Sequence, residues 1–331
     1  MDSLLEVRNL KKYFDVSRGK LHAVDDVSFS IKAGETLGIV GESGCGKSTL
    51  GRVILRLHEP DAGKIIFDGM NITQFSRKEM RKMRSRMQII FQDPFSSLNP
   101  RYTVAQIIEE PLNLNNMYPN HKERREYVEQ LMDMVGLSKR MYNSYPHEFD
   151  GGRRQRIGIA RALAVNPEFI VCDEPVSALD VSIQAQILNL MMELQQRLGL
   201  TYMFISHDLS VVKYISDRVA VMYLGNVVEL ASKDALYEDP RHPYTVALLL
   251  AIPTTELDKP DNAIILEGSI PSPINPPSGC KFHTRCFMAC EKCTRVPPEL
   301  VEIEPGHYVA CHFPERKLNP DGSYTFEIKK K

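Results

Sequence analysis

The stretch that decides the fold is Gly41-Glu42-Ser43-Gly44-Cys45-Gly46-Lys47-Ser48, which Thr49 follows. It stands between a short apolar run, TLGIV at 36–40, and a helix-forming run that begins TLGRVILRL. A strand-to-helix turn of this kind is typical of a phosphate-binding loop, because its glycines let backbone N–H groups face phosphate oxygens. We expect Lys47 to reach the β- and γ-phosphates, Ser48 to coordinate Mg²⁺ and Thr49 to add a hydroxyl contact. The alternative is a glycine-rich turn that holds no ligand.

A second pair of candidate residues follows the apolar run FIVC at 169–172. Asp173 and Glu174 stand where a buried parallel strand is predicted to end, and parallel sheets bind ligands at that end. Asp173 is suited to hold Mg²⁺ through water, and Glu174 is suited to act as general base on an attacking water. The alternative is that the two acids cap the next element.

The distribution of apolar residues predicts an α/β fold. Short strand-like runs separated by Gly and Asp-Gly turns open the chain, and helical spacing prevails from Arg77 to Val165, most clearly at Lys122–Val135 and Arg154–Ala164. Beyond it, short apolar strands alternate with a helix at 182–198, which indicates a buried parallel sheet. Proline-rich sequence then predicts a domain boundary near Pro240.

The charge balance and the apolar runs of the chain indicate neither nucleic-acid binding nor a membrane span. The formal net charge is -1, so no large electrostatic bias towards nucleic acid or anionic lipid is present. The N-terminus lacks the apolar segment of a signal peptide, and the longest strongly apolar run, Val246–Ile252, is far shorter than the roughly 20 residues that cross a bilayer. We therefore expect a cytosolic protein without a nucleic-acid partner, whose membrane association depends on another protein.

Taken in order, these motifs resemble the nucleotide-binding subunit of ABC transporters over nearly all of residues 4–251. The resemblance implies a P-loop NTPase fold of the ABC ATPase type, with a RecA-like parallel-sheet core, an antiparallel β subdomain and a helical subdomain inserted at about residues 93–165. The nucleotide-binding domain would cover residues 1–239 and would hydrolyse ATP with Mg²⁺. Phe14, in LKKYF, stands at the family's adenine-stacking position, although its neighbour Tyr13 leaves the register open by one residue.

Three further segments take their roles from the same resemblance. Gln92, after MQIIF, is at the position of the glutamine that senses Mg²⁺ and contacts the transmembrane partner. His207, in FISHD, matches the switch histidine that bridges Glu174 and the γ-phosphate, so Glu174 and His207 are the expected catalytic residues. The loop at 177–180 matches the segment that crosses the interface between two ATPase subunits.

The family's signature sequence, commonly LSGGQ, is altered in this chain. It reads Phe149-Asp150-Gly151-Gly152-Arg153, with Asp150 at the serine position and Arg153 at the glutamine position. In the family this loop faces the γ-phosphate bound to the other subunit, where an ionised aspartate would oppose the phosphate charge. One interpretation is a weakened second ATP site in a heterodimer with a paralogous ATPase. The other is that Asp150 only caps the following helix.

Residues 240–331 are interpreted as a small Cys-rich C-terminal extension. The segment DPRHPYT at 239–245, followed by ALLLAIP, resembles the extension of peptide-importer ATPases, which include dipeptide, oligopeptide and nickel systems. The resemblance implies uptake of di- or oligopeptides, with nickel or another small solute as the alternative cargo. It implies three kinds of partner: the second ATPase, two transmembrane permease subunits and an extracytoplasmic substrate-binding protein. The chain would then lie peripherally on the cytoplasmic face of the cell membrane.

Four cysteines of the extension are candidate metal ligands: Cys280, Cys286, Cys293 and Cys311. Such crowding in a reducing compartment suggests metal rather than disulfides, and the CxxC spacing from Cys290 to Cys293 is typical of zinc sites. Importer subunits with a similar tail carry a four-iron four-sulfur (4Fe–4S) cluster, so the resemblance favours that cluster, with Cys290 as a spectator. Zn²⁺ and no metal are the alternatives. The expected role is to staple a loop-rich tail.

Two other kinds of ABC ATPase compete with the transporter interpretation. DNA-repair members carry long insertions between the phosphate loop and the signature, and translation-factor members usually hold two cassettes in one chain. The length of this chain disfavours both. A regulatory subunit without hydrolysis is suggested by the altered signature alone, and intact Lys47, Asp173, Glu174 and His207 argue against it.

Overall fold

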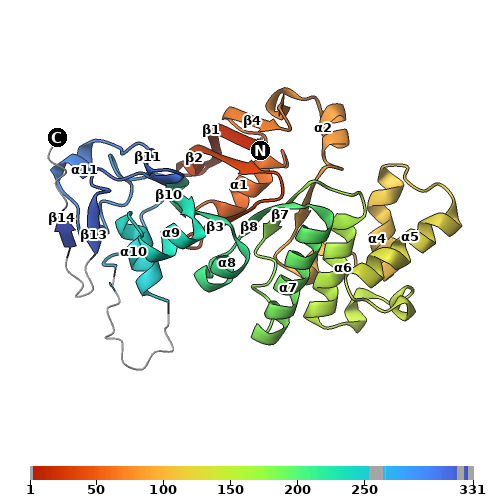
Figure 1. Cartoon of the computed structure of the whole chain (residues 1–331). Helices are drawn as coiled ribbons and strands as arrows, with labels where there is room; N and C mark the ends of the chain where they lie inside the picture. The colour runs from red at the N-terminus through yellow and green to blue at the C-terminus, as the bar shows by residue number, and fades with distance from the viewer. Residues whose placement is uncertain (1–2, 253–263, 265, 319–323, 327–331) are drawn as a thin grey trace.

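The computed structural model describes residues 3–252, 264, 266–318 and 324–326. A mixed sheet occupies the middle of the molecule, with helices α4 and α5 at one end and the C-terminal strands at the other (Figure 1). The described residues form three parts: a central sheet, an antiparallel sheet and a helical region.

Among the described residues, the central sheet has eight strands in the order β11-β12-β10-β9-β3-β8-β7-β6. From β9 to β6 every neighbouring pair is parallel, whereas β10, β12 and β11 add to the β9 edge as antiparallel strands. The strands are β3 (Thr36–Val40), β6 (Met87–Ile90), β7 (Phe169–Asp173), β8 (Thr201–Ile205), β9 (Arg218–Tyr223), β10 (Asn226–Ser232), β11 (Val301–Glu304) and β12 (His307–Val309). The buried parallel sheet predicted from the apolar runs is thus confirmed.

Side chains on the two faces of this sheet enter two different hydrophobic cores. On β7, Ile170 and Cys172 belong to the core beneath the helical region, whereas Phe169 and Val171 belong to the core shared with the antiparallel sheet. This division follows from the alternation of side chains along a strand. Because both faces are covered, all five residues of β7 are buried, and the strand reads as an unbroken apolar run up to its final aspartate.

The antiparallel sheet is formed by strands within residues 3–71, in the order β2-β1-β4-β5. Its strands are β1 (Ser3–Val16), β2 (Gly19–Lys32), β4 (Ala62–Phe67) and β5 (Met70–Asn71). Helix α1 (Lys47–Ile54) packs between this sheet and the central one, with Leu50, Val53 and Ile54 buried.

The helical region lies between β6 and β7 in the chain. It comprises α3 (Pro94–Ser97), α4 (Val104–Leu114), α5 (His121–Met134) and α6 (Gly151–Leu163), with the 3₁₀ turns Lys139–Met141 and Pro146–Glu148 between them. A capping box at Thr103 begins α4, in which the Thr103 hydroxyl accepts from Gln106 N–H and the Gln106 side chain accepts from Thr103 N–H. The two helices expected here are present, within three residues of their predicted starts. Before β6, the turn Ile72–Gln74 leads into α2 (Arg77–Met83).

In the described part of the chain, strands β7, β8 and β10 are each followed by a helix. Helix α7 (Val181–Leu198) ends at Gly199, which adopts φ 65° and closes the helix in the left-handed region. Helix α8 (Leu209–Ile215) follows β8, and α9 (Lys233–Glu238) follows β10.

Regular structure is sparse in the described residues from Arg241 onward, which are called the C-terminal segment below. After α10 (Pro243–Leu250) come α11 (Glu291–Arg295), β11 and β12, and then the hairpin of β13 (Arg316–Leu318) and β14 (Tyr324–Phe326). Strands β11 and β12 extend the central sheet through β10, so the sheet runs across the boundary expected near Pro240.

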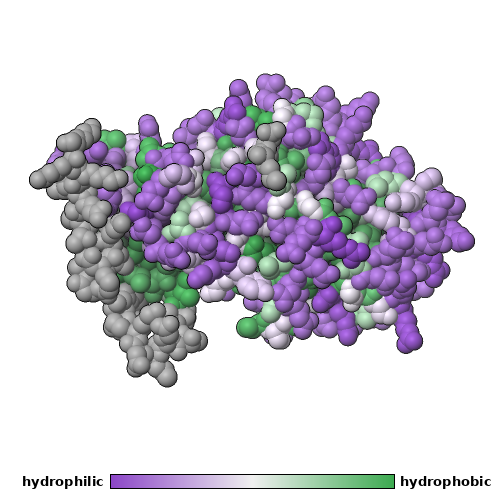
Figure 2. Space-filling model, in the orientation of Figure 1, coloured by the Kyte–Doolittle hydropathy of each residue, from purple (hydrophilic) through white to green (hydrophobic). Residues whose placement is uncertain are grey.

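The face shown in Figure 2 is largely hydrophilic, with an apolar patch over the α10 region beside the grey atoms. In the described part of the chain, no helix combines the length and apolar character needed to cross a membrane.

Candidate active site

The loop at 41–48 leaves β3 and enters α1 through glycines in the left-handed region. Gly41 has φ 150°, Gly44 has φ 79° and Gly46 has φ 106°. A Cβ on Gly41 would lie 2.2 Å from the carbonyl oxygen of Met222, and one on Gly46 would lie 2.0 Å from that of Ala23. Only glycine fits these two positions, because both the backbone angle and the neighbouring carbonyl exclude a side chain.

Lys47 begins helix α1 and is buried inside the loop that precedes it. Its Nζ donates to the carbonyl oxygen of Gly41 at 2.7 Å and to that of Glu42 at 3.1 Å. The ammonium group is therefore held over the loop, close to the backbone that is expected to bind phosphate. Burial raises the pKa of Cys45, so this thiol stays neutral beside the lysine.

Ser48 and Asp173 meet although 125 residues separate them in the chain. The Ser48 hydroxyl donates to Asp173 Oδ1 at 2.6 Å, and Arg52 Nη2 lies 3.6 Å from Asp173 Oδ2. Burial raises the pKa of Asp173, while the Ser48 hydrogen bond and the Arg52 charge oppose that shift. A hydroxyl and a carboxylate side by side are oxygen ligands of the kind that Mg²⁺ prefers, so the donor set fits this ion.

The Glu174 carboxylate is contacted by side chains that follow two neighbouring strands. Its Oε2 accepts from Gln92 Nε2 at 2.9 Å and lies 3.2 Å from His207 Nδ1. Gln92 follows β6, Glu174 follows β7 and His207 follows β8, so the three side chains come from adjacent carboxyl ends of the parallel sheet. Glu174 also has φ 48°, an uncommon value for a non-glycine residue and one that is often found at functional sites.

The two aromatic candidates lie on consecutive positions of β1 and make different contacts. Tyr13 packs against His22 with ring centroids 4.3 Å apart, and its hydroxyl donates to Asp25. Phe14 packs edge-on against His58 at 5.4 Å. The adenine-stacking role of Phe14 stays a prediction.

The altered signature lies at the start of α6. Asp150 is the N-cap residue: its Oδ1 accepts from Arg153 N–H at 2.8 Å, while the Arg153 guanidinium lies 3.6 Å from Oδ2. The capping geometry weighed as the second interpretation is present. A Cβ on Gly151 would approach Leu179 at 2.9 Å, so this glycine packs closely on the loop at 177–180.

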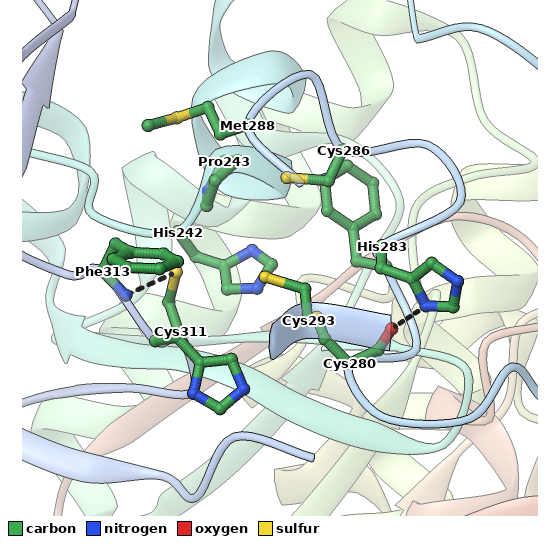
Figure 3. A pocket seen from close by; sticks show the side chains of 11 residues that line it. His242, Pro243, Cys280, His283, Cys286, Met288, Cys293, Cys311 and Phe313 are labelled. Atoms are coloured by element: carbon green, nitrogen blue, oxygen red, sulfur yellow. Dashed lines mark hydrogen bonds between the residues drawn. The ribbon is translucent and has the colours of Figure 1, made fainter. Parts of the chain in front are cut away.

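The four candidate cysteines, 280, 286, 293 and 311, line one small cavity of about 20 Å³ together with His242, Phe282 and Met288. In Figure 3 Cys286, Cys293 and Cys311 turn their sulfur atoms towards a common space. Burial raises the pKa of Cys286 to about 12, which favours the neutral thiol in the absence of a cation.

The geometry of this cavity does not fit a metal ion as it stands. Within the described residues, no group of three or more His, Cys, Asp or Glu side chains is arranged to hold one. The sulfur donors are of the right kind for a 4Fe–4S cluster or Zn²⁺, and they share a cavity, but their present spacing supports neither.

Three residues that contact the phosphate-binding loop or strand β2 were not singled out as site residues by the sequence. Tyr244 accepts a hydrogen bond from Glu42 N–H, Arg285 pairs with the Glu42 carboxylate, and Lys281 pairs with Asp25. Tyr244 belongs to the quoted DPRHPYT segment, so a local signal existed for it. Arg285 and Lys281 had none, because each meets its partner across more than 240 residues of chain.

The geometry agrees with comparisons to known proteins. Residues 24–177 match the ABC transporter family, and residues 228–293 match the family described as oligopeptide/dipeptide transporter, C-terminal region. Together with full-length relatives that are more than half identical, these matches show that the chain belongs to the ABC transporter family of ATP-binding proteins. It is accordingly an ABC-type ATPase.

Two of the similar proteins are named for oligopeptide transport. The oligopeptide transport ATP-binding protein AppF of Bacillus subtilis (strain 168) is 56% identical over 321 residues, covering 94% of this chain and 97% of AppF. The putative oligopeptide transport ATP-binding protein YkfD of the same strain is 55% identical over 312 residues, covering 93% and 95% of the two chains. Among solved structures, the ATP-binding cassette MJ0796, a dimer bound to ADP and Pi, gives a TM-score of 0.63 at 30% identity, over 69% of this chain and 98% of that one.

Proposed function

We propose that this chain is the ATP-hydrolysing subunit of an importer for di- or oligopeptides. The observation that carries the ATPase part is the convergence of Gln92 and His207 on Glu174, beside the phosphate-binding loop. The peptide part is supported by the C-terminal match at 228–293 and by relatives named for oligopeptide transport.

The arrangement supports a specific division of roles during hydrolysis. Lys47 and the backbone of the loop bind the phosphates, while Ser48 and Asp173 would hold Mg²⁺, which would neutralise phosphate charge when bound. Glu174 takes the proton of the attacking water, and His207 orients Glu174 towards the γ-phosphate. Gln92 lies against the same carboxylate, so a movement of the segment after β6 would alter the position of the base.

The domain boundaries and the partner subunits are also part of the proposal. We propose a nucleotide-binding domain at 1–239 with the helical subdomain at about 93–165, and a C-terminal extension from 240 onward. The chain would pair with a second, paralogous ATPase and with two transmembrane permease subunits on the cytoplasmic face of the membrane. An extracytoplasmic binding protein would deliver the peptide. Support comes from the relatives' names and from the altered signature at Asp150.

The test is ATP-driven peptide uptake by the complete transporter in lipid vesicles. Native protein should couple ATP hydrolysis to uptake of a labelled oligopeptide only when the permease subunits and the binding protein are present. Glu174→Gln should lower both activities by roughly 10²- to 10⁴-fold, the usual contribution of a general base. Glu193→Gln, an exposed change on α7, is the control. ATPase activity that needs no membrane subunit and drives no uptake would contradict the proposal.

A metal centre on Cys280, Cys286, Cys293 and Cys311 is a second part of the proposal, supported by their thiol donors and shared cavity, and binding would require these sulfur atoms to move closer together. Iron, acid-labile sulfide and zinc should be measured in protein purified without oxygen. We expect four irons per chain, with loss of iron in Cys286→Ser and retention in Cys290→Ser. Zinc in place of iron would change the identity of the metal, and absence of both would contradict the centre.

A further inference from the structure

The second residue of the phosphate-binding loop, Glu42, is held by two residues of the C-terminal segment. Arg285 Nη1 and Nη2 donate to the two carboxylate oxygens of Glu42 at 2.7 and 3.0 Å, in a bidentate pair. Tyr244 Oη accepts from Glu42 N–H at 2.9 Å. Both the side chain and the backbone of Glu42 are therefore fixed from outside the nucleotide-binding domain proposed above.

The ion pair of Arg285 with Glu42 is largely buried and is not a surface ion pair. The Arg285 side chain is 7% exposed, and its guanidinium lies over the ring of Tyr223. Tyr223, Tyr244 and Phe282 pack against one another with centroid separations of 4.8 to 5.3 Å, and so form an aromatic layer beneath the loop. A bidentate pair in such surroundings is geometrically specific and poorly screened by solvent.

The charge of Glu42 has a consequence for the loop's ligand. A carboxylate on a phosphate-binding loop repels the negative charges of a nucleotide, and this repulsion acts through a partly buried environment. Arg285 neutralises that carboxylate, whereas the expected phosphate contacts come from backbone N–H groups and Lys47. Without the guanidinium, Glu42 would be an uncompensated negative charge at the phosphate site.

We infer that Arg285 is a positioning residue for nucleotide: with Tyr244 it fixes Glu42, and by neutralising the Glu42 carboxylate it sets the affinity of the loop for MgATP. The inference rests on the proposed function, in which this loop binds MgATP. It also links the loop from Cys280 to Cys286 to the nucleotide site, since Arg285 belongs to that loop and pairs with Glu42.

The experiment measures binding of Mg²⁺ with the non-hydrolysable analogue AMP-PNP to the full chain by calorimetry. Arg285→Ala should raise Kd about tenfold because a full charge becomes uncompensated. The double variant Arg285→Ala/Glu42→Gln should regain most of that loss, with Glu42→Gln completing the cycle. In the assembled transporter, Arg285→Ala should raise KM for ATP and leave kcat within about twofold. A merely structural role would not be rescued by Glu42→Gln.

Matched controls separate this effect from general loss of stability. Arg86 makes a bidentate pair with Glu168 at the start of β6 and β7, so Arg86→Ala removes a similar pair away from the loop and should not change Kd. Tyr244→Phe should raise Kd about threefold, roughly what one lost hydrogen bond gives. Tyr127→Phe, which removes a hydroxyl bonded to Ala164 O, should not.

The outcomes of these binding measurements test the role of Arg285 and the proposed function separately. Equal Kd in native protein and Arg285→Ala, or a double variant as weak as the single one, would overturn the inference while leaving the ATPase intact. A native chain that fails to bind MgAMP-PNP would contradict the proposed function itself. Should Arg285→Ala not fold, Arg285→Lys with and without Glu42→Gln decides the question in the same way, with a smaller expected rise of about threefold.

Discussion

The carboxyl ends of strands β6 to β8 and the C-terminal segment place functional groups by opposite means. At the strand ends, Gln92, Glu174 and His207 come within hydrogen-bonding distance because adjacent strands lie about 4.8 Å apart and end together. In the C-terminal segment, Arg285 and Lys281 stand on irregular backbone and are held by ion pairs to residues far away in the chain.

Substitutions in these two regions are therefore expected to have different effects. Loss of a strand-end group should abolish chemistry while the sheet persists, because the backbone ladder does not depend on that side chain. Loss of a C-terminal contact should lower stability or affinity, because there the side chains themselves hold the backbone in place.

The largest effect is expected at the loop lysine. Lys47→Ala removes the buried ammonium expected to neutralise the phosphates, so ATPase activity should fall at least about 10³-fold. The thermal midpoint should change little, as measured by circular dichroism. Lys64→Ala, on β4, serves as the control. A variant that kept a tenth of native activity would remove Lys47 from the site.

The next effect tests the anchor of the C-terminal segment. Glu229 is fully buried on β10, where its carboxylate accepts from the N–H groups of Arg241 and His242 and lies 2.8 Å from His307 Nε2. Glu229→Ala leaves these groups unpaired and should lower the free energy of unfolding by about 3 kcal/mol. Urea unfolding measures this, with the exposed Glu299→Ala as comparison. A loss below about 1 kcal/mol would show that the segment is anchored elsewhere.

A smaller effect is expected at the pair of Lys281 with Asp25. Burial alone would raise the pKa of Asp25, but hydrogen bonds from Lys281 and Tyr13 lower it from 3.8 to about 2. A carboxyl with a lowered folded-state pKa stabilises the protein above pH 3.8, and that stability is lost as the pH falls through about 2.

Lys281→Met should therefore cost about 1 kcal/mol at neutral pH, a value reduced by the partial exposure of the pair. The difference from native protein should vanish as the pH falls from 4 towards 2. Lys292→Met, at an exposed position of α11, should show no such dependence. A pH-independent difference would mean that Lys281 acts through packing alone.

The smallest effect concerns the altered signature. Asp150→Ser keeps a good N-cap for α6 and removes the carboxylate, so stability should be unchanged, whereas Asp150→Ala should lose about 1 kcal/mol. If the carboxylate opposes phosphate across a subunit interface, Asp150→Ser should raise the ATPase rate of the assembled complex about threefold. An unchanged rate would leave Asp150 as a helix cap only.

The sequence by itself determined the class of fold and the elements of the strand-end site. The loop at 41–48, the buried strand ending in Asp173 and the polar residues after β6 and β8 are local patterns, so each could be recognised within a short window. The parallel sheet then brings such positions together without further information, because strand ends of one sheet share an edge.

Only the tertiary structure decided how the C-terminal segment contacts the phosphate-binding loop. Nothing near Arg285 in the sequence indicates Glu42 as its partner, and Glu229 appears as one more residue of a strand until Arg241, His242 and His307 surround it. The continuation of the central sheet by β11 and β12 was equally hidden, since these short strands carry little pattern of their own. Long-range ion pairs and edge pairings depend on where loops bring the chain, and that depends on packing of the whole molecule.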